Sequence, residues 1–180
     1  MKSKQGKKIF AFRGIPYAKP PVGDRRFRRS EPAEPWCGVR DGTSEARKSY
    51  QPNVLMPGSP FRDGGEDCLY LNVYSTQPKE ALPVLVWIHG GGFTAGAGDW
   101  YRPDYLLDYD LVVVSIDYRL GALGLLGLDS PTLSGNQGLR DQALALEWVQ
   151  NNIAAFGGDP NRVSVGGAST YKMVPGDDHG

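Results

Sequence analysis

In the stretch Pro83-Val84-Leu85-Val86-Trp87-Ile88-His89-Gly90-Gly91-Gly92-Phe93, an apolar run ends in one histidine and three glycines, and this stretch decides the fold. Residues 84–88 show no alternation of apolar and polar side chains, which predicts a strand buried on both faces in a parallel sheet. Glycine has no Cβ atom, so its backbone can approach a ligand closely and turn N–H groups toward it. N–H groups held in this way stabilise the oxyanion of a tetrahedral intermediate, which favours acyl-transfer chemistry.

Two other interpretations of the glycines stay open from the residues alone. The first is a turn that only changes the direction of the chain. The second is phosphate binding, because Gly90-x-Gly92-x-x-Ala95 fits the loose dinucleotide fingerprint. That fingerprint needs a helix that starts on the glycines, so that its N-terminus can hold the pyrophosphate. Residues 97–103 have no helical period and include Pro103, which disfavours nucleotide binding.

The composition predicts a chain able to bury a core of single-domain size, with 40% hydrophobic residues and no apolar run long enough for a membrane span. Twenty Lys and Arg residues balance twenty Asp and Glu residues, so net charge points to no nucleic acid and no anionic membrane. Ten of the basic residues precede Ser30, against the single acid Asp24. They alternate with apolar residues, which favours a solvated face over a nucleic-acid-binding arm. We expect no cofactor.

The N-terminal residues and the two cysteines leave the compartment open. Residues 2–8 are polar or basic and are followed by only a short apolar run, which is not the pattern of a secretory signal peptide. Cys37 and Cys68 can form one disulfide or remain two thiols, and two residues at this spacing cannot make a zinc site alone.

The rest of the chain predicts an α/β sheet. An edge strand is expected at 8–13, and the proline-rich segment 14–23 is expected to be a surface loop. Further strands are expected at 69–75, 84–88, 111–116 and 162–165. Between the last two strands, Leu139, Ala143, Leu146, Val149, Ile153 and Phe156 recur at helical spacing, and the helix should end at Gly157-Gly158. Strand, helix and strand in this order imply a right-handed parallel crossover.

An ordered set of motifs identifies a family. The blocks are Phe12-Arg13-Gly14-Ile15-Pro16-Tyr17-Ala18, Pro20-Pro21-Val22-Gly23, Arg26-Phe27, Pro35-Trp36, Glu66-Asp67-Cys68-Leu69-Tyr70-Leu71-Asn72-Val73-Tyr74, the glycine stretch, Tyr118-Arg119-Leu120-Gly121, Gly135-Asn136-Gln137-Gly138-Leu139, Asp141-Gln142, Trp148-Val149-Gln150-Asn151-Asn152-Ile153 and Phe156-Gly157-Gly158-Asp159-Pro160. From Lys7 to Ser169 the chain resembles the N-terminal part of a type-B carboxylesterase, the family that includes cholinesterases. The resemblance implies an incomplete α/β-hydrolase fold that ends at the nucleophile elbow, with residues 1–169 as the N-terminal part of a carboxylesterase type-B domain and 170–180 as a divergent tail.

The resemblance also implies the catalytic positions. Gly166-Gly167-Ala168-Ser169-Thr170-Tyr171 stands where the family has Gly-Glu-Ser-Ala-Gly, which puts Ser169 at the nucleophile. The amides of Gly91, Gly92 and Thr170 are then the oxyanion-hole donors, and the substrate is a small-molecule ester. Small residues two positions on either side of the serine let strand and helix approach. Gly167 meets this requirement, whereas Tyr171 replaces the second glycine.

A serine hydroxyl needs a histidine base and an acid that orients the histidine, and in this family both follow the serine. His89 precedes the glycines and is expected to brace the loop, and His179 lies in a tail with no recognisable structure. We therefore expect a truncated product that is inactive as this chain. The alternative is a cholinesterase-like binding or adhesion protein without catalysis, which Ala168 and Tyr171 favour. The sequence leaves the particular ester, the oligomeric state and the compartment open, and the resemblance is compatible with secretion.

Three structural expectations complete the analysis. By resemblance, Arg26 pairs with Glu66 and Arg119 with Asp141 as buried ion pairs. Cys68 is expected to be unpaired, because Ser49 or Tyr50 stands where the family has its usual partner. Because the sequence supplies one strong helix, the apolar strands 84–88, 111–116 and 163–165 should lack cover and promote aggregation.

Overall fold

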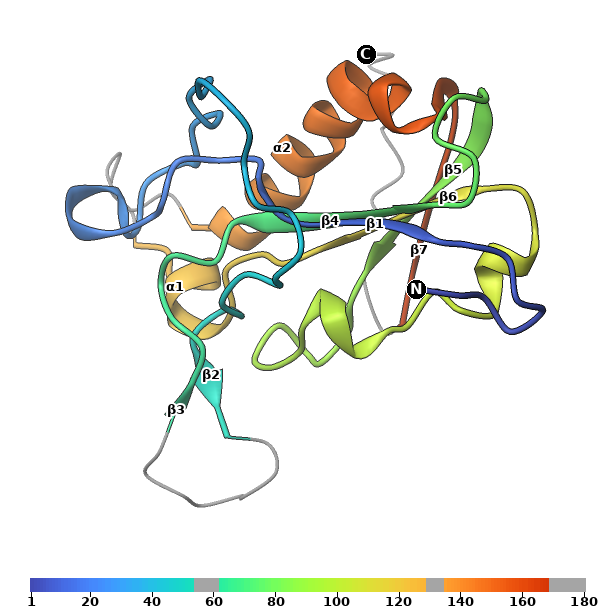
Figure 1. Cartoon of the computed structure of the whole chain (residues 1–180). Coiled ribbons are helices and arrows are strands. Elements are labelled where there is room, and N and C mark those ends of the chain that lie inside the picture. Colours follow the sequence, from blue (N-terminus) through green and yellow to red (C-terminus); the bar gives the residue numbers. More distant parts are fainter. Residues whose placement is uncertain (54–61, 129–134, 169–180) are drawn as a thin grey trace, which may run out of the picture.

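A mixed five-stranded sheet is the centre of the fold (Figure 1). The computed structural model describes residues 1–53, 62–128 and 135–168. Within these ranges the strands are β1 (Phe10–Pro16), β2 (Gln51–Pro52), β3 (Arg62–Asp63), β4 (Tyr70–Ser75), β5 (Leu82–Ile88), β6 (Val112–Ile116) and β7 (Gly158–Gly167). The α-helices there are α1 (Gly121–Leu125) and α2 (Gln137–Asn152), and the 3-10 turns are η1 (Gly23–Arg25), η2 (Gly98–Trp100), η3 (Leu106–Asp108) and η4 (Ile153–Phe156).

The strand order β1-β4-β6-β5-β7 sets the polarity of the sheet. β5 runs parallel to β6 on one side and to β7 on the other, with Ile88 opposite Ile116 and Gly167. β4 is antiparallel to β6, and β1 is antiparallel to β4. The predicted parallel crossover from β6 through α2 to β7 is therefore present. The carboxyl ends of three parallel strands meet at one edge, which is where open α/β sheets bind ligands.

The segment 14–23 differs from the prediction at its start. Gly14, Ile15 and Pro16 continue strand β1, with Ile15 opposite Leu71 and Pro16 opposite Tyr70. A proline is tolerated there because β1 is the edge strand, so the missing N–H removes no ladder hydrogen bond. The register shifts between Phe12 and Ile15, and the Gly14 N–H donates instead to the Asn72 side chain at 3.0 Å.

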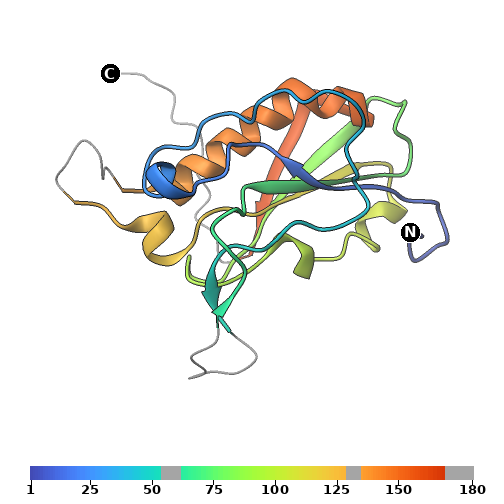
Figure 2. The same cartoon turned by 60° about the vertical axis from the view of Figure 1, so that its left-hand side comes forward.

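Helix α2 forms where its apolar period predicts, although one predicted member of the buried stripe is wrong. Ala145, Val149 and Ile153 are fully buried against the sheet, whereas Ala143 is exposed. The helical segment ends through η4 at Gly157, whose φ of +83° suits the glycine that commonly follows a helix. Figure 2 shows α2 lying along one face of the sheet.

The predicted burial of 84–88 on both faces is also wrong. Val84, Val86 and Ile88 are buried on the side of α2, but Leu85 and Trp87 are only partly buried. Strand β6 is covered on both faces, contrary to the expectation for 111–116, because η3 and the N-terminal segment pack on its second side through Leu107 and Ile9.

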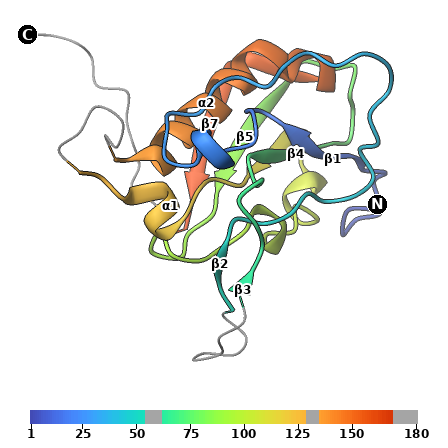
Figure 3. The ribbon, with the colours of Figure 1, turned by 90° about the vertical axis from the view of Figure 1, so that its left-hand side faces the viewer.

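Strand β7 is the most exposed strand of the five-stranded sheet. Within the described ranges it pairs only with β5, and Val165 is 42% exposed. The expectation of missing cover therefore applies to β7 and to one face of β5. Figure 3 shows the pair β2–β3 extending away from the sheet.

Candidate active site

The candidate site lies at the carboxyl edge of the parallel strands. His89 follows β5, Asp117 follows β6, and Ala168 follows β7. The sequence therefore brings the glycine stretch and the segment before the predicted nucleophile to the same edge of the sheet. Ser169 and Thr170, the other two predicted site residues, lie outside the described residues.

The glycine loop adopts backbone angles that favour glycine. Gly91 and Gly92 have φ values of +121° and +60°. A Cβ atom on Gly91 would lie 1.9 Å from the Ala95 carbonyl oxygen, so the loop accepts no side chain there. The Gly91 carbonyl accepts hydrogen bonds from the N–H groups of Thr94 and Ala95 at 3.1 and 3.2 Å, which closes a tight turn.

Gly91 and Gly92 are both exposed, as is Thr94. Their N–H groups donate no hydrogen bond to any residue in the described ranges, whereas the N–H groups of Thr94, Ala95, Gly96 and Gly98 all donate to protein acceptors. Two consecutive donors thus face solvent from a turn whose amides at Thr94, Ala95, Gly96 and Gly98 are satisfied. Such a pair can bind an oxyanion without first breaking an internal hydrogen bond.

His89 holds the base of the loop. Its ring is fully buried, stacks on Tyr118 at 4.5 Å between ring centroids, and places Nδ1 2.9 Å from the Gly90 carbonyl oxygen. The Tyr118 hydroxyl donates to the His89 carbonyl oxygen at 2.8 Å. Burial lowers the pKa of His89, which favours the neutral imidazole. These contacts fit the predicted bracing role.

Gln51 clamps the far end of the loop, and sequence reasoning missed it. Its side chain accepts the Gly96 N–H and donates to the Gly96 carbonyl oxygen, both at 2.8 Å. No short-range pattern reveals this contact, because the two residues are 45 positions apart. Gln51 lies two residues after Ser49, whose hydroxyl donates to the Tyr118 carbonyl oxygen at 2.6 Å.

Asp117 fixes the segment after the loop. Its Oδ1 accepts the Gly98 N–H at 2.9 Å and lies 3.9 Å from the His89 Nε2. Burial raises the pKa of this carboxyl to about 7. The His89 Nε2 has no hydrogen-bond partner among the described residues, so the His89 and Asp117 side chains approach each other without a direct hydrogen bond.

One of the two predicted ion pairs is buried, and the other is not. Arg119 and Asp141 form a two-pronged pair at 2.8 and 2.7 Å, with side chains 2% and 0% exposed. Arg26 and Glu66 do pair, at 2.8 Å, but their side chains are 44% and 31% exposed. The predicted burial of this second pair is therefore wrong, because Arg26 follows the surface turn η1.

Cys68 is unpaired, as predicted. It is buried, its burial raises the pKa of the thiol to about 12, and Cys37 is an exposed free thiol. In the described part of the chain, no three His, Cys, Asp or Glu side chains gather into a group that could hold a metal ion. No helix in that part is long and apolar enough to cross a membrane.

The comparisons with known proteins agree with one another. The model of the carboxylesterase family matches residues 1–170. Among curated proteins, the chain is 47% identical to juvenile hormone esterase from Tribolium castaneum over 93% of this chain and 29% of the relative. It is 49% identical to acetylcholinesterase from Bungarus fasciatus over 89% of this chain and 29% of the relative. It is 47% identical to esterase E4 from Myzus persicae over 91% of this chain and 31% of the relative.

A solved structure has the same arrangement of elements. Juvenile hormone esterase from Manduca sexta, with OTFP covalently attached, matches with a TM-score of 0.84 and 41% identity over 92% of this chain and 32% of that one. The fold is thus part of an α/β-hydrolase fold. The chain spans about a third of the length of the proteins it matches.

Proposed function

This chain belongs to the carboxylesterase family, and from this premise we propose that it supplies the oxyanion-binding half of a carboxylic ester hydrolase. In the proposed reaction, the Ser169 hydroxyl attacks the ester carbonyl carbon while a base takes its proton. The carbonyl oxygen becomes an oxyanion, the alcohol leaves, and water then releases the acid from the acyl-serine.

A single observation carries the proposal: the exposed Gly91 and Gly92 N–H groups have no protein acceptor in the described ranges and lie at the carboxyl edge beside β7. With the amide of Thr170, these two groups are the proposed donors to the oxyanion. His89, Gln51 and Asp117 hold the loop before substrate arrives, so the donors need no reorganisation during the reaction. The proposed substrate is a small-molecule ester. The covalent adduct named for the Manduca sexta esterase is consistent with a nucleophilic mechanism in this fold.

The test uses tetrahedral anion binding to the chain. Methyl phenylphosphonate, a monoanion whose oxygens surround a tetrahedral phosphorus, is titrated into the chain while the backbone amide signals are followed by NMR. Saturable shifts at Gly91 and Gly92 are expected. The amides of Gly96 and Gly98 are internal controls because each already donates to a side-chain oxygen. Unmoved Gly91 and Gly92 signals at saturating anion would refute the proposal.

We further propose that these 180 residues by themselves turn over no ester. The sequence contains two histidines. The His89 ring is fully buried, its Nδ1 lies 2.9 Å from the Gly90 carbonyl oxygen and its face stacks on Tyr118, which disfavours a role as the base. His179, the second histidine, lies outside the described residues. Hydrolysis of p-nitrophenyl acetate by the chain and by a Ser169→Ala variant should proceed at the same rate. A rate that depends on Ser169 would refute this part and would make His89 the first candidate base.

The second candidate function is a cholinesterase-like binding protein without catalysis. Ala168 and Tyr171 favour it, because they depart from the family pattern around Ser169. Such a protein has no need of oxyanion donors. It therefore predicts no specific phosphonate shift at Gly91 and Gly92, and the titration separates the two functions.

A further inference from the structure

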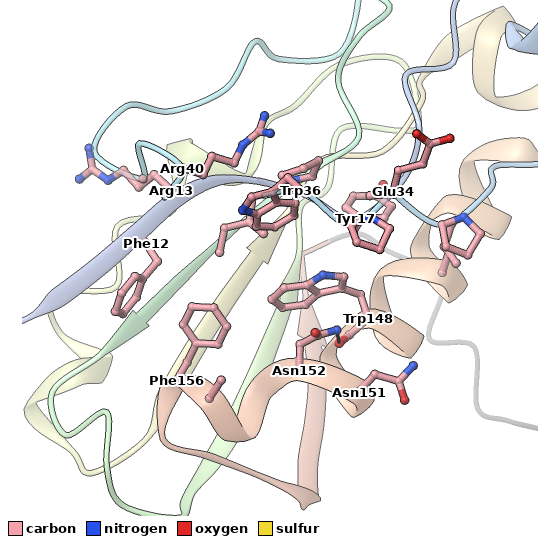
Figure 4. Close-up of a pocket in the computed structure, with 18 of the residues that line it drawn as sticks. Phe12, Arg13, Tyr17, Glu34, Trp36, Arg40, Trp148, Asn151, Asn152 and Phe156 are labelled. Atoms are coloured by element: carbon pink, nitrogen blue, oxygen red, sulfur yellow. Dashed lines mark hydrogen bonds between the residues drawn. The ribbon is translucent and has the colours of Figure 1, made fainter. Parts of the chain in front are cut away.

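A second concave site lies away from the glycine loop. A pocket of about 550 Å³ is enclosed by β1, the loop 32–42 and the C-terminal half of α2 with η4 (Figure 4). None of its lining residues belongs to the segment 89–96. Its volume falls within the roughly 300–1,000 Å³ of typical small-molecule sites.

Aromatic rings stand on two sides of the pocket. Phe156 contacts Phe12 edge-to-face at 5.0 Å between centroids and Trp148 at 5.9 Å, so three rings from β1, α2 and η4 make one continuous wall. Trp36 comes from the loop 32–42, on the other side of the pocket, and is 47% exposed. In the described ranges, no other aromatic ring stacks on Trp36, whose recorded ring contact is the guanidinium of Arg40 at 5.5 Å. Large apolar rings are therefore left accessible on both sides of the hollow.

The charged side chains around the pocket carry both signs, and two of them are ion-paired. Arg13 pairs with Glu45 at 3.2 Å, and Glu34 pairs with Lys19 at 3.1 Å. The Asp41 carboxylate accepts the N–H and the hydroxyl of Thr43. Two further charged side chains line the pocket with no ion pair among the described residues: Glu147, on an exposed part of α2, and Arg40, whose guanidinium lies 5.5 Å from the Trp36 ring centroid. An anionic ligand would meet the carboxylates of Asp41 and Glu147, and a cationic ligand the guanidinium of Arg40, so the lining favours an uncharged ligand.

Uncharged polar groups lie at the exposed rim of the pocket. Asn151 and Asn152 both line it, and Figure 4 shows their side chains below Trp148. The Asn152 amide nitrogen donates to the Trp148 carbonyl oxygen at 2.8 Å, which leaves its amide oxygen as an acceptor. An acceptor at the edge of an aromatic wall suits a ligand with one hydroxyl or N–H donor.

We propose that this pocket binds an uncharged, planar aromatic small molecule between Trp36 and the wall of Phe12, Trp148 and Phe156. The aromatic body contacts rings on both sides, and a polar substituent at its edge reaches the amides of Asn151 and Asn152. The site is independent of the proposed ester hydrolysis, because it uses none of the residues assigned to that reaction.

The experiment is an NMR titration of the chain with 2-naphthol, followed through the indole N–H signals of its four tryptophans. Trp36 and Trp148 should shift and saturate, whereas Trp87 and Trp100, which do not line the pocket, are controls within the same chain. Equal shifts of all four signals, as from general adsorption to apolar surface, would overturn the proposal.

Two comparisons sharpen the result. Replacing the half-exposed Trp36 by alanine leaves the core intact and should weaken 2-naphthol binding about tenfold, whereas Trp100→Ala should leave it unchanged. The anion 2-naphthoate and the cation 2-naphthylmethylammonium share the same rings and should bind more weakly than 2-naphthol. A Trp36→Ala variant of unchanged affinity, or tighter binding of either charged probe, would contradict an uncharged aromatic ligand.

Discussion

Gly91 is the residue at which the structure constrains the candidate site most. Its N–H has no acceptor in the described part of the chain, and its carbonyl oxygen accepts hydrogen bonds from two backbone amides. A Cβ atom on its Cα would clash with the Ala95 carbonyl oxygen. The neighbouring Gly92 has a left-handed φ, but a Cβ atom there would lie in open space, with the Thr94 hydroxyl oxygen 4.0 Å away as its nearest contact. The two adjacent glycines are therefore required for different physical reasons, steric at Gly91 and conformational at Gly92.

This difference predicts unequal costs of alanine substitution. Gly91→Ala forces a backbone clash as well as strain and should lower the free energy of unfolding by at least about 3 kcal/mol. Gly92→Ala brings only the left-handed strain of about 1–2 kcal/mol. Urea denaturation of both variants measures the two values. A Gly92→Ala variant as destabilised as Gly91→Ala would contradict the described turn.

A pH dependence follows from Asp117. Burial raises its pKa from 3.8 to about 7, so the folded chain keeps a proton that the unfolded chain releases. The stability from this carboxyl is full below about pH 4 and is lost as the pH rises to about 7. An Asp117→Asn variant, whose amide oxygen can still accept the Gly98 N–H, does not titrate. Its free energy of unfolding relative to the native chain should therefore rise with pH by roughly 2–4 kcal/mol across this window. A difference that stays flat from pH 4 to 7 would exclude the raised pKa.

At the scale of elements, the sequence predicts strands and the main helix well because their side-chain periods are local. Strands β5 and β6 cover residues 84–88 and 112–116 of the predicted strands 84–88 and 111–116, and the predicted stripe from Leu139 to Phe156 lies in α2 and η4. The sequence does not show which sheet face another segment will cover, so the apolar run of β5 predicts two buried faces where the structure has one. It also does not show pairing partners at long range. For this reason the sequence predicts neither the extension of β1 to Pro16 nor the hydrogen bonds between the Gln51 side chain and Gly96.

Local sequence patterns likewise reveal one of the two proposed sites and not the other. Gly91 and Gly92 could be found because a histidine and three glycines after an apolar strand form a local pattern. The pocket between Trp36 and Trp148 has no such pattern, because its walls come from β1, a loop and α2 and meet only in the folded chain. Residues from separate elements become neighbours through packing, which periodicity does not encode.

Helix α2 is held to the rest of the fold by the pair of Arg119 and Asp141. Asp141→Asn removes the carboxylate from a buried guanidinium and should cost about 3–5 kcal/mol in the free energy of unfolding. Glu66→Gln breaks the exposed pair with Arg26 and is the matched control, for which no resolvable change is expected. Thermal and urea unfolding of both variants decides the matter. Equal effects would mean that the burial of Arg119 does not set the energy of the pair.

At the scale of the whole molecule, the apolar surface is unevenly covered. One face of the sheet carries α2, β6 is covered on both faces, and β7 leaves Val165 exposed beside an edge with no partner in the described ranges. An exposed apolar edge strand is a template for pairing with another chain. We therefore expect the purified chain to self-associate through β7.

Analytical ultracentrifugation tests this expectation. Val165→Lys places a charge on β7 and should raise the dissociation constant of self-association about tenfold or more. Val39→Lys makes the same replacement at a fully exposed loop position and should leave association unchanged. Association that both variants reduce equally would indicate a general charge effect, and association that neither changes would locate the contact elsewhere.

The central claim is that Gly91 and Gly92 form a preorganised oxyanion site, and the most direct measurement compares two anions of equal charge and different shape. Methyl phenylphosphonate presents tetrahedral oxygens like those of the reaction intermediate, whereas benzoate is planar. The Gly91 and Gly92 amide signals should shift and saturate with the phosphonate at a concentration at least about tenfold lower than with benzoate. Equal affinities for the two anions, or shifts that are no larger at Gly91 and Gly92 than at Gly96, would contradict the claim.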